Sequence, residues 1–142
     1  MISYPISFHG VSEANSGMQN VWTVSSSNFE TSCAVPKEFE GCGGTFSPED
    51  FFLLSLQNCF IATFKVYAEY SKLNFDKLHV TSELIVDKND NNKPVMKTLK
   101  LKIEITNPSD QRKADMLIKK TLDNGFILQS VNTEIIPEIS IR

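Results

Sequence analysis

The chain has 142 residues, of which 41% are hydrophobic and 22% are charged, and its formal net charge is −3. This length and composition predict a single globular domain over residues 1–142 and argue against disorder. An acidic balance without a Lys/Arg cluster argues against a nucleic-acid-binding protein.

The N-terminus and the longest apolar segment bear on the location of the protein. Residues 1–10 lack the basic start and the apolar run of a signal peptide. The apolar segment around residues 51–70 is interrupted by polar side chains, so we expect no membrane span. Three widely spaced cysteines without an export signal favour free thiols in a reducing cytoplasm.

Short strands are predicted in the first forty residues. Apolar and more polar side chains alternate over residues 2–8 and again over residues 29–35. A third apolar run, residues 21–24, is followed by residues 25–28, a sequence typical of a hairpin connection. Three glycines within residues 41–44 then predict a flexible loop.

A long helix is predicted next. Ser47 suits the N-cap, Pro48 suits the first helical position, and Asp50 stands three residues after the cap, as a capping box requires. The helix is expected to run from residue 48 to about residue 73. Its polar residues form one narrow stripe, so we expect most of its circumference to be buried. Cys59 lies in the middle of this helix, away from the polar stripe.

The second half of the chain predicts two strands, a helix and a last strand. Residues 78–86 and 99–105 alternate with period two and are joined by a polar loop, which indicates a hairpin. Residues 107–110 repeat the capping pattern and open a second helix, which Asn124-Gly125 is expected to end with a left-handed C-cap. In the last strand, residues 133–141, Pro137 indicates a sheet edge.

The order of these elements predicts an α+β fold. Helices are expected to pack on antiparallel sheets. The long helix in the centre of the domain is what the family resemblance described next implies.

The segment GGTFSPEDFFLLSLQNCF, residues 43–60, resembles the OsmC/Ohr family of osmotically inducible and organic hydroperoxide resistance proteins. Members carry a Ser/Asn-Pro-Glu helix start and then a Cys, often followed by Phe. The following strand pair and second helix also come in the family's order. The resemblance implies an intertwined homodimer that reduces organic hydroperoxides with a thiol reductant, at sites on the subunit interface.

By this resemblance Cys59 is the peroxidatic cysteine and Glu49 is the carboxylate that orients the activating group. The family uses an arginine from the N-terminal half to hold the thiolate and a second cysteine after the second helix to close a disulfide. This chain departs from the family at both points. Its only arginines are Arg112 and Arg142, and Gly125 stands where the second cysteine falls.

A reactive Cys59 therefore needs substitutes for the missing groups. An unassisted thiol has a pKa of about 8.5, and the helix dipole acts only near the first turn, so a nearby cation is required. Lys37 and His9 are candidates, although a lysine lacks the bidentate fork of arginine. Cys42 is a candidate resolving thiol, across a dimer rather than within one chain. If no protein thiol serves, a small thiol has to resolve a sulfenic acid.

Glu49 and Cys59 cannot meet within one straight helix. Ten residues separate them by about 15 Å along the axis. A shared site therefore needs a bend in the chain or Glu49 from a second subunit.

Simpler explanations stay open beside the catalytic one. Cys59 can be a packing thiol, Glu49 an acid favoured by the helix dipole, and Cys33 a core residue. The alternative functions are a non-catalytic dimer that binds a small hydrophobic ligand and a redox sensor whose dimer packing changes on oxidation. His9 and His79 share no metal-like spacing, so we expect neither a metal nor another cofactor.

Overall fold

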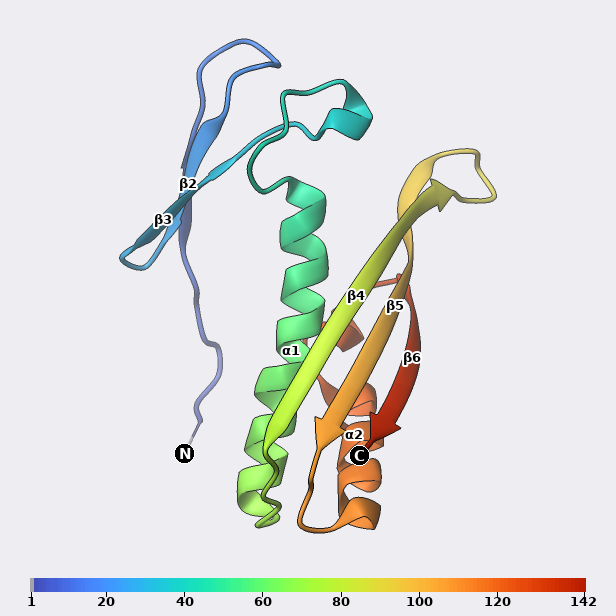
Figure 1. Ribbon diagram of the computed structural model, residues 1–142. Helices are drawn as coiled ribbons and strands as arrows, with labels where there is room; N and C mark the ends of the chain where they lie inside the picture. Colours follow the sequence, from blue (N-terminus) through green and yellow to red (C-terminus); the bar gives the residue numbers. More distant parts are fainter. Residues whose placement is uncertain (1) are drawn as a thin grey trace. The chain divides into compact units, whose positions relative to one another are not determined.

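The structure, a computed structural model, describes residues 2–142. The chain divides into two compact units, Met1–Phe51 and Phe52–Arg142. Each unit contains its own three-stranded sheet. In Figure 1 the labelled strands of the first sheet are blue, and those of the second run from yellow-green through orange to red.

The first unit is built on an antiparallel sheet in the order β1-β2-β3. Its strands are β1 (Gly10–Glu13), β2 (Trp22–Ser26) and β3 (Phe29–Cys33). The predicted hairpin between the second and third of these strands is confirmed. Ser26 pairs with Phe29 across a tight turn, in which Ser27 has a φ of 57°.

The strand predicted over residues 2–8 is wrong. Residues 2–9 form no strand, and all their side chains are exposed. Pro5 has no N–H to offer a ladder, and within residues 2–142 the segment finds no strand to pair with. Alternation alone was therefore not enough to make a strand here.

The segment after β3 is held by backbone hydrogen bonds rather than left free. It contains the short 3₁₀ helix η1 (Lys37–Phe39) and the glycine-rich loop. Gly41 N donates to Pro36 O at 3.0 Å, and Gly43 N donates to Val35 O at 3.1 Å. A Cβ at Gly41 would overlap the Val35 carbonyl, so this close approach requires glycine.

The capping box predicted at the start of the long helix is confirmed. Helix α1 (Pro48–Tyr70) begins after Ser47, whose Oγ accepts a hydrogen bond from Asp50 N at 3.1 Å. Asp50 Oδ2 in return accepts from Ser47 N at 2.8 Å and from Ser47 Oγ at 3.0 Å. These reciprocal bonds satisfy backbone donors that the helix itself leaves free.

Helix α1 ends three residues earlier than predicted. Lys72 adopts a left-handed φ of 55°. Leu73 N donates to Ala68 O at 2.9 Å, and Lys72 N donates to Glu69 O at 3.2 Å. This pair of bonds is a Schellman motif, which stops the helix without a glycine.

The second unit is built on a mixed sheet in the order β4-β5-β6. Its strands are β4 (Lys77–Lys88), β5 (Pro94–Thr106) and β6 (Glu134–Ile141). The predicted hairpin is confirmed as the antiparallel pair β4–β5, whereas β6 runs parallel to β5. Pro137 lies in β6 at the edge of the sheet, as predicted. The α+β class is confirmed.

The core of the second unit lies between this sheet and two helices. From Leu99 to Ile105, every second residue of β5 points to the same side and is buried in the core that α1 and α2 (Gln111–Asn124) share. In Figure 1 the helices α1 and α2 run alongside this sheet. The largest fully buried side chains of the core are Leu56, Phe60 and Phe64 from α1, Leu99, Leu101, Ile103 and Ile105 from β5, and Ile118 from α2.

Helix α1 is less buried in the single chain than predicted. Its buried residues are Leu56, Phe60, Phe64 and Ala68, which form one face with a spacing of four. Val66 and Tyr70 are 51% and 85% exposed. An apolar composition indicates what a helix surface can bury, but burial depends on which other elements reach that surface.

By length and composition, α1 is also the one helix within residues 2–142 that is apolar enough to cross a membrane, with a mean hydropathy of 1.3. Its Leu56–Ala68 face packs against the sheet of the second unit, which favours a core helix over a membrane span.

The capping box makes a contribution to stability that can be tested. Asp50→Ala removes the acceptor of two hydrogen bonds at the start of α1. The free energy of unfolding, measured by urea denaturation, should fall by about 1 kcal/mol. Asp90→Ala removes an exposed carboxylate from the β4–β5 turn and is the matched control, with an expected change below about 0.5 kcal/mol. Equal losses in the two variants would contradict the capping role.

Candidate functional site

Cys59 lies in the middle of α1, at the margin of the hydrophobic core. Its side chain is half-buried and packs against the core cluster, next to the fully buried Phe60. The thiol is free. The core therefore holds the side chain in place while part of it stays accessible, a combination that suits a reactive thiol.

Gly125 is buried beside the Cys59 thiol. A Cβ built on Gly125 would lie 3.2 Å from Cys59 Sγ, 2.9 Å from Leu128 Cδ1 and 3.3 Å from Thr121 O. In a disulfide each Cβ lies about 3 Å from the partner's sulfur, because the S–S bond is about 2.05 Å long. Residue 125 therefore occupies the position of a disulfide partner for Cys59.

The left-handed cap predicted at Gly125 is wrong. The residue has φ −59° and ψ 127°, a conformation that any L-residue adopts. Its position is fixed by two backbone bonds: Gly125 N donates to Thr121 O, and Gln129 N donates to Gly125 O, both at 2.9 Å. The absence of a side chain matters here for the close approach to Leu128 and Cys59, not for the backbone angle.

Glu49 is half-buried in the first turn of α1, and its charge affects the pKa of Cys33. Burial raises the pKa of Cys33, a backbone hydrogen bond with Ala34 lowers it, and the charges of Glu49 and Asp50 raise it further. Cys33 is 2% exposed, as expected of a core residue. Glu49 precedes Cys59 by ten residues of the same helix.

Lys37 and Cys42 both lie in the segment of the first unit between β3 and α1. The Lys37 side chain lies over Gly43, since a Cβ there would be 2.9 Å from Lys37 Cγ. Cys42 is half-buried and its thiol is free. His9 is exposed just before β1, and its carbonyl accepts from Ser26 Oγ at 2.7 Å.

These three residues belong to the first unit, and Cys59 belongs to the second. A role for Lys37 or His9 in activating Cys59, or for Cys42 in resolving it, therefore stays a prediction.

An open groove lies in the second unit, on the part of α1 that precedes Cys59. It has a volume of about 510 Å³, within the range of small-molecule sites. Phe52, two turns before Cys59, forms part of its wall. The lining residues are Phe52, Asn89, Val95, Met96, Lys97, Val131, Asn132 and Thr133.

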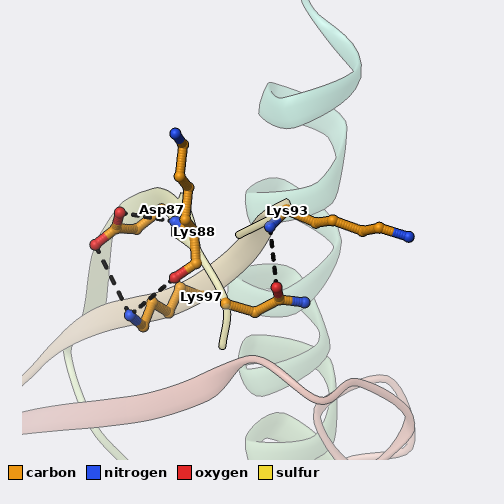
Figure 2. Close-up of polar contacts among 5 residues, drawn as sticks. Asp87, Lys88, Lys93 and Lys97 are labelled. Carbon is orange, nitrogen blue, oxygen red and sulfur yellow. Dashed lines mark hydrogen bonds and ion pairs between the residues drawn. The ribbon is translucent and has the colours of Figure 1, made fainter. Parts of the chain in front are cut away.

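The one charged side chain in the wall of this groove is already engaged. Figure 2 shows Lys97 Nζ donating to Lys88 O at 3.2 Å, with Asp87 Oδ2 at 3.8 Å. At the same turn, Asn89 Oδ1 accepts from Lys93 N at 3.0 Å. With Lys97 engaged at the turn and with Phe52, Val95, Met96 and Val131 in its wall, the groove suits an apolar group better than an anion.

Comparison with known proteins decides the family. Residues 41–140 match the model of the OsmC-like protein family, which covers the long helix, Cys59 and Gly125. The chain belongs to the OsmC-like protein family. The resemblance seen in the sequence is thereby confirmed.

Solved structures of family members share the fold at low sequence identity. An OsmC-like protein from Mycoplasma pneumoniae superposes with a TM-score of 0.82 at 16% identity, over 97% of this chain and 99% of that one. An organic hydroperoxide resistance protein OsmC from Legionella pneumophila gives 0.73 at 20% identity, over 96% and 98%.

A curated relative matches over a shorter stretch. The uncharacterised protein YmaD of Bacillus subtilis is 35% identical over 68 residues, which is 48% of this chain and 45% of YmaD. The match therefore spans less than half the length of that protein.

Two features of the site were not predicted from the sequence. The groove is formed by Phe52, the β4–β5 turn and the residues before β6, which are far apart in the chain and carry no shared motif. The contact of Gly125 with Cys59 was implied only by the family's second cysteine. The glycine that follows α2 was the one local signal, and it was interpreted as a helix cap.

Gly125→Cys tests the geometry of the pair. The new thiol should form a disulfide with Cys59 under mild oxidation, because the Cβ position already matches and the backbone angles permit cysteine. Intact-mass analysis and peptide mapping would show the loss of two hydrogens and the cross-link. The closed loop should raise the free energy of unfolding by about 4 kcal/mol.

Asn124→Cys is the matched control, since its exposed position is adjacent in sequence but has no such contact with Cys59. A disulfide that forms equally well in the control would contradict the specific placement of residue 125.

Cys33 should make stability depend on alkaline pH. Its pKa in the folded chain is raised above the ordinary value of 9.0, so folding favours the protonated thiol. This contribution is present in full below pH 9.0 and is lost as the pH rises through the folded pKa. The unfolding free energy of Cys33→Ala should therefore fall less steeply above pH 9.0 than that of the parent chain. Parallel pH profiles from urea denaturation would contradict this.

Proposed function

We propose that this OsmC-like protein reduces organic hydroperoxides at Cys59 with electrons from a thiol. The observation that carries the proposal is the position of Cys59 Sγ. It is half-buried in α1 and faces the disulfide-partner position at residue 125, in a chain of the OsmC-like family. A solved relative is named an organic hydroperoxide resistance protein, which supports the reduction of organic hydroperoxides as the class of reaction.

The peroxide step needs the Cys59 thiolate and a proton source. The Cys59 thiolate attacks one peroxide oxygen, an S–O bond forms, and the O–O bond breaks. The leaving alkoxide takes a proton and departs as the alcohol, and Cys59 becomes a sulfenic acid. Two molecules of thiol then reduce the sulfenic acid: they are oxidised to a disulfide, the oxygen leaves as water, and Cys59 becomes a thiol again. The nearby groove offers an apolar surface for the organic part of the peroxide.

Lys37 is our candidate for the cation that favours the thiolate, with His9 as the second candidate. Among residues 2–142 neither side chain takes part in an ion pair, so the charge of Lys37 is uncompensated. Glu49 is our candidate for the carboxylate that orients the cation. A helix rise of about 1.5 Å per residue separates Glu49 from Cys59 in one subunit, which favours Glu49 of a second subunit.

The proposal includes a homodimer in the cytoplasm. Both units expose large apolar side chains that a second copy can cover, among them Phe8, Phe29, Val66, Tyr70 and Phe126. A reducing compartment keeps the three free cysteines reduced.

A non-catalytic binding protein is the second candidate function. The groove next to Phe52 favours it, because its volume and apolar wall suit a small hydrophobic ligand without any use of Cys59. The two candidate functions predict different effects of Cys59→Ser: a peroxidase loses its activity, whereas a binding protein keeps its affinity for an apolar ligand.

Cys59→Ser should reduce the consumption of cumene hydroperoxide, with dithiothreitol as reductant, to the rate without protein. Serine keeps the size of the side chain but removes the nucleophilic sulfur. Cys42→Ser is the matched control and should keep most of the activity, because dithiothreitol replaces any resolving thiol.

Intact-mass analysis of the parent chain after a brief excess of peroxide should show one added oxygen, mapped to Cys59. If Cys59 stays reduced while an active relative oxidises, the peroxidase proposal is wrong. Binding of an apolar fluorescent probe that survives Cys59→Ser would then favour the binding protein.

A further inference from the structure

Residues 2–8, the N-terminal arm, have the side-chain pattern of a strand, but within residues 2–142 no strand pairs with them. In Figure 1 the arm is an extended trace that leads from the N-terminus to β1. Every second side chain of the arm is large, apolar and at least 50% exposed, namely Ile2, Tyr4, Ile6 and Phe8. The side chains between them belong to two serines and one proline. The arm therefore carries an apolar face that the single chain leaves in water.

Strand β4 offers free backbone groups along its outer edge. It is 12 residues long, and within residues 2–142 it pairs with β5 alone. An unpaired strand edge presents a row of N–H and C=O groups to which another strand can add. At this edge of the core, Leu78 and Leu84 are only half-buried. An added strand with one apolar face would pair with the backbone of β4 and extend the cover of these two side chains.

The other sheet edges suit the arm less well. In the first unit, β1 has 4 residues and β3 has 5, fewer than the arm. Strand β6 has 8 residues, but Pro137 in its middle has no N–H to donate. Of the edge strands in the described part of the chain, β4 is therefore the one that is longer than the arm and contains no proline.

We propose that the arm of one copy of this chain adds as a strand to the outer edge of β4 in a second copy. By two-fold symmetry the second copy returns its own arm, so the contact is made twice. The apolar side chains of the arm face the core of the receiving sheet, beside Leu78 and Leu84. Pro5 then turns the side that lacks an N–H toward solvent, where an edge strand tolerates proline. This inference rests on the homodimer of the proposed function and names the surface that holds it together.

The area of this contact is sufficient for a stable dimer. A covered aromatic side chain buries about 150–250 Å². Four apolar side chains from each copy, together with the surface that they cover, bury roughly 1,200–2,000 Å² in total, the range of specific protein interfaces. A second copy is favoured over a lipid surface as the partner, because the backbone of the arm also needs hydrogen-bond partners and hydrocarbon supplies none.

Ile6→Asp tests the apolar face of the arm in the full chain. In the complex the new carboxylate would be buried against the receiving sheet, so the dissociation constant of the dimer should rise by about tenfold or more. Analytical ultracentrifugation measures this constant. Both Ile6 and Ser7 are exposed in the single chain, so a change at either leaves its fold intact.

Ser7→Asp is the matched control, because the adjacent side chain lies on the opposite face of the arm and stays in water. Its dissociation constant should remain close to that of the parent chain. Equal effects of the two variants, or a parent chain that is monomeric, would overturn the inference.

Hydrogen exchange locates the contact on β4. At protein concentrations that favour the dimer, Ile6→Asp should speed the exchange of the outward-facing amides of β4 by about tenfold or more relative to the parent chain. The amides of β5 are the internal reference, since β5 is paired on both sides within one chain. A synthetic peptide of residues 2–9, added to Ile6→Asp, should slow β4 again. If β4 exchanges alike in the parent and the variant, or if the peptide slows another edge strand instead, the arm does not bind at β4 and the inference is wrong.

These measurements need no peroxide and are therefore separate from the test of the proposed reaction. If Cys59 stays reduced under excess peroxide while the arm still protects β4, the peroxidase is wrong and the exchange of arms stands. If Cys59 oxidises in a dimer that Ile6→Asp leaves unchanged, the peroxidase stands and the exchange of arms is wrong.

Discussion

The packing of α1 against β5 is the constraint on which the second unit depends. Four helical residues at a spacing of four meet four strand residues at a spacing of two, and both sets are buried almost completely. Each buried aliphatic or aromatic side chain contributes about 1.5–3 kcal/mol of transfer free energy. Cys59 directly precedes Phe60, a member of this buried face. The core sets the rotation of the helix about its axis and therefore also fixes the direction of the thiol.

Local signals predicted most of the fold correctly. The capping box at Ser47 and Asp50 depends on four neighbouring residues, so the sequence contains all the information needed to place it. The alternation over β4 and β5 is similarly local, and it is long enough to indicate a period of two residues and therefore a strand. Residues 2–8 show the limit of such patterns. Alternation indicates which side chains share a face, but a strand also needs a neighbour with free backbone groups.

The site was predicted less completely because it depends on contacts between distant parts of the chain. Cys59 was found from its place after the helix start, and Gly125 from the family's second cysteine. Neither spacing nor composition indicates that a Cβ at residue 125 would touch Cys59 Sγ. The predicted burial around α1 failed for a related reason. Composition describes the helix surface, whereas burial depends on which other elements reach that surface.

The backbone angles at Gly125 have an evolutionary consequence. A glycine codon that ends in a pyrimidine becomes a cysteine codon by a single base change. Because φ −59° and ψ 127° suit cysteine, this change requires no rearrangement of the main chain. Variants with one cysteine and with two cysteines at the Cys59 site are therefore adjacent in sequence space on this scaffold. A cysteine Cβ at residue 125 would lie 2.9 Å from Leu128 Cδ1, so the change asks a flexible side chain to shift and leaves the backbone in place.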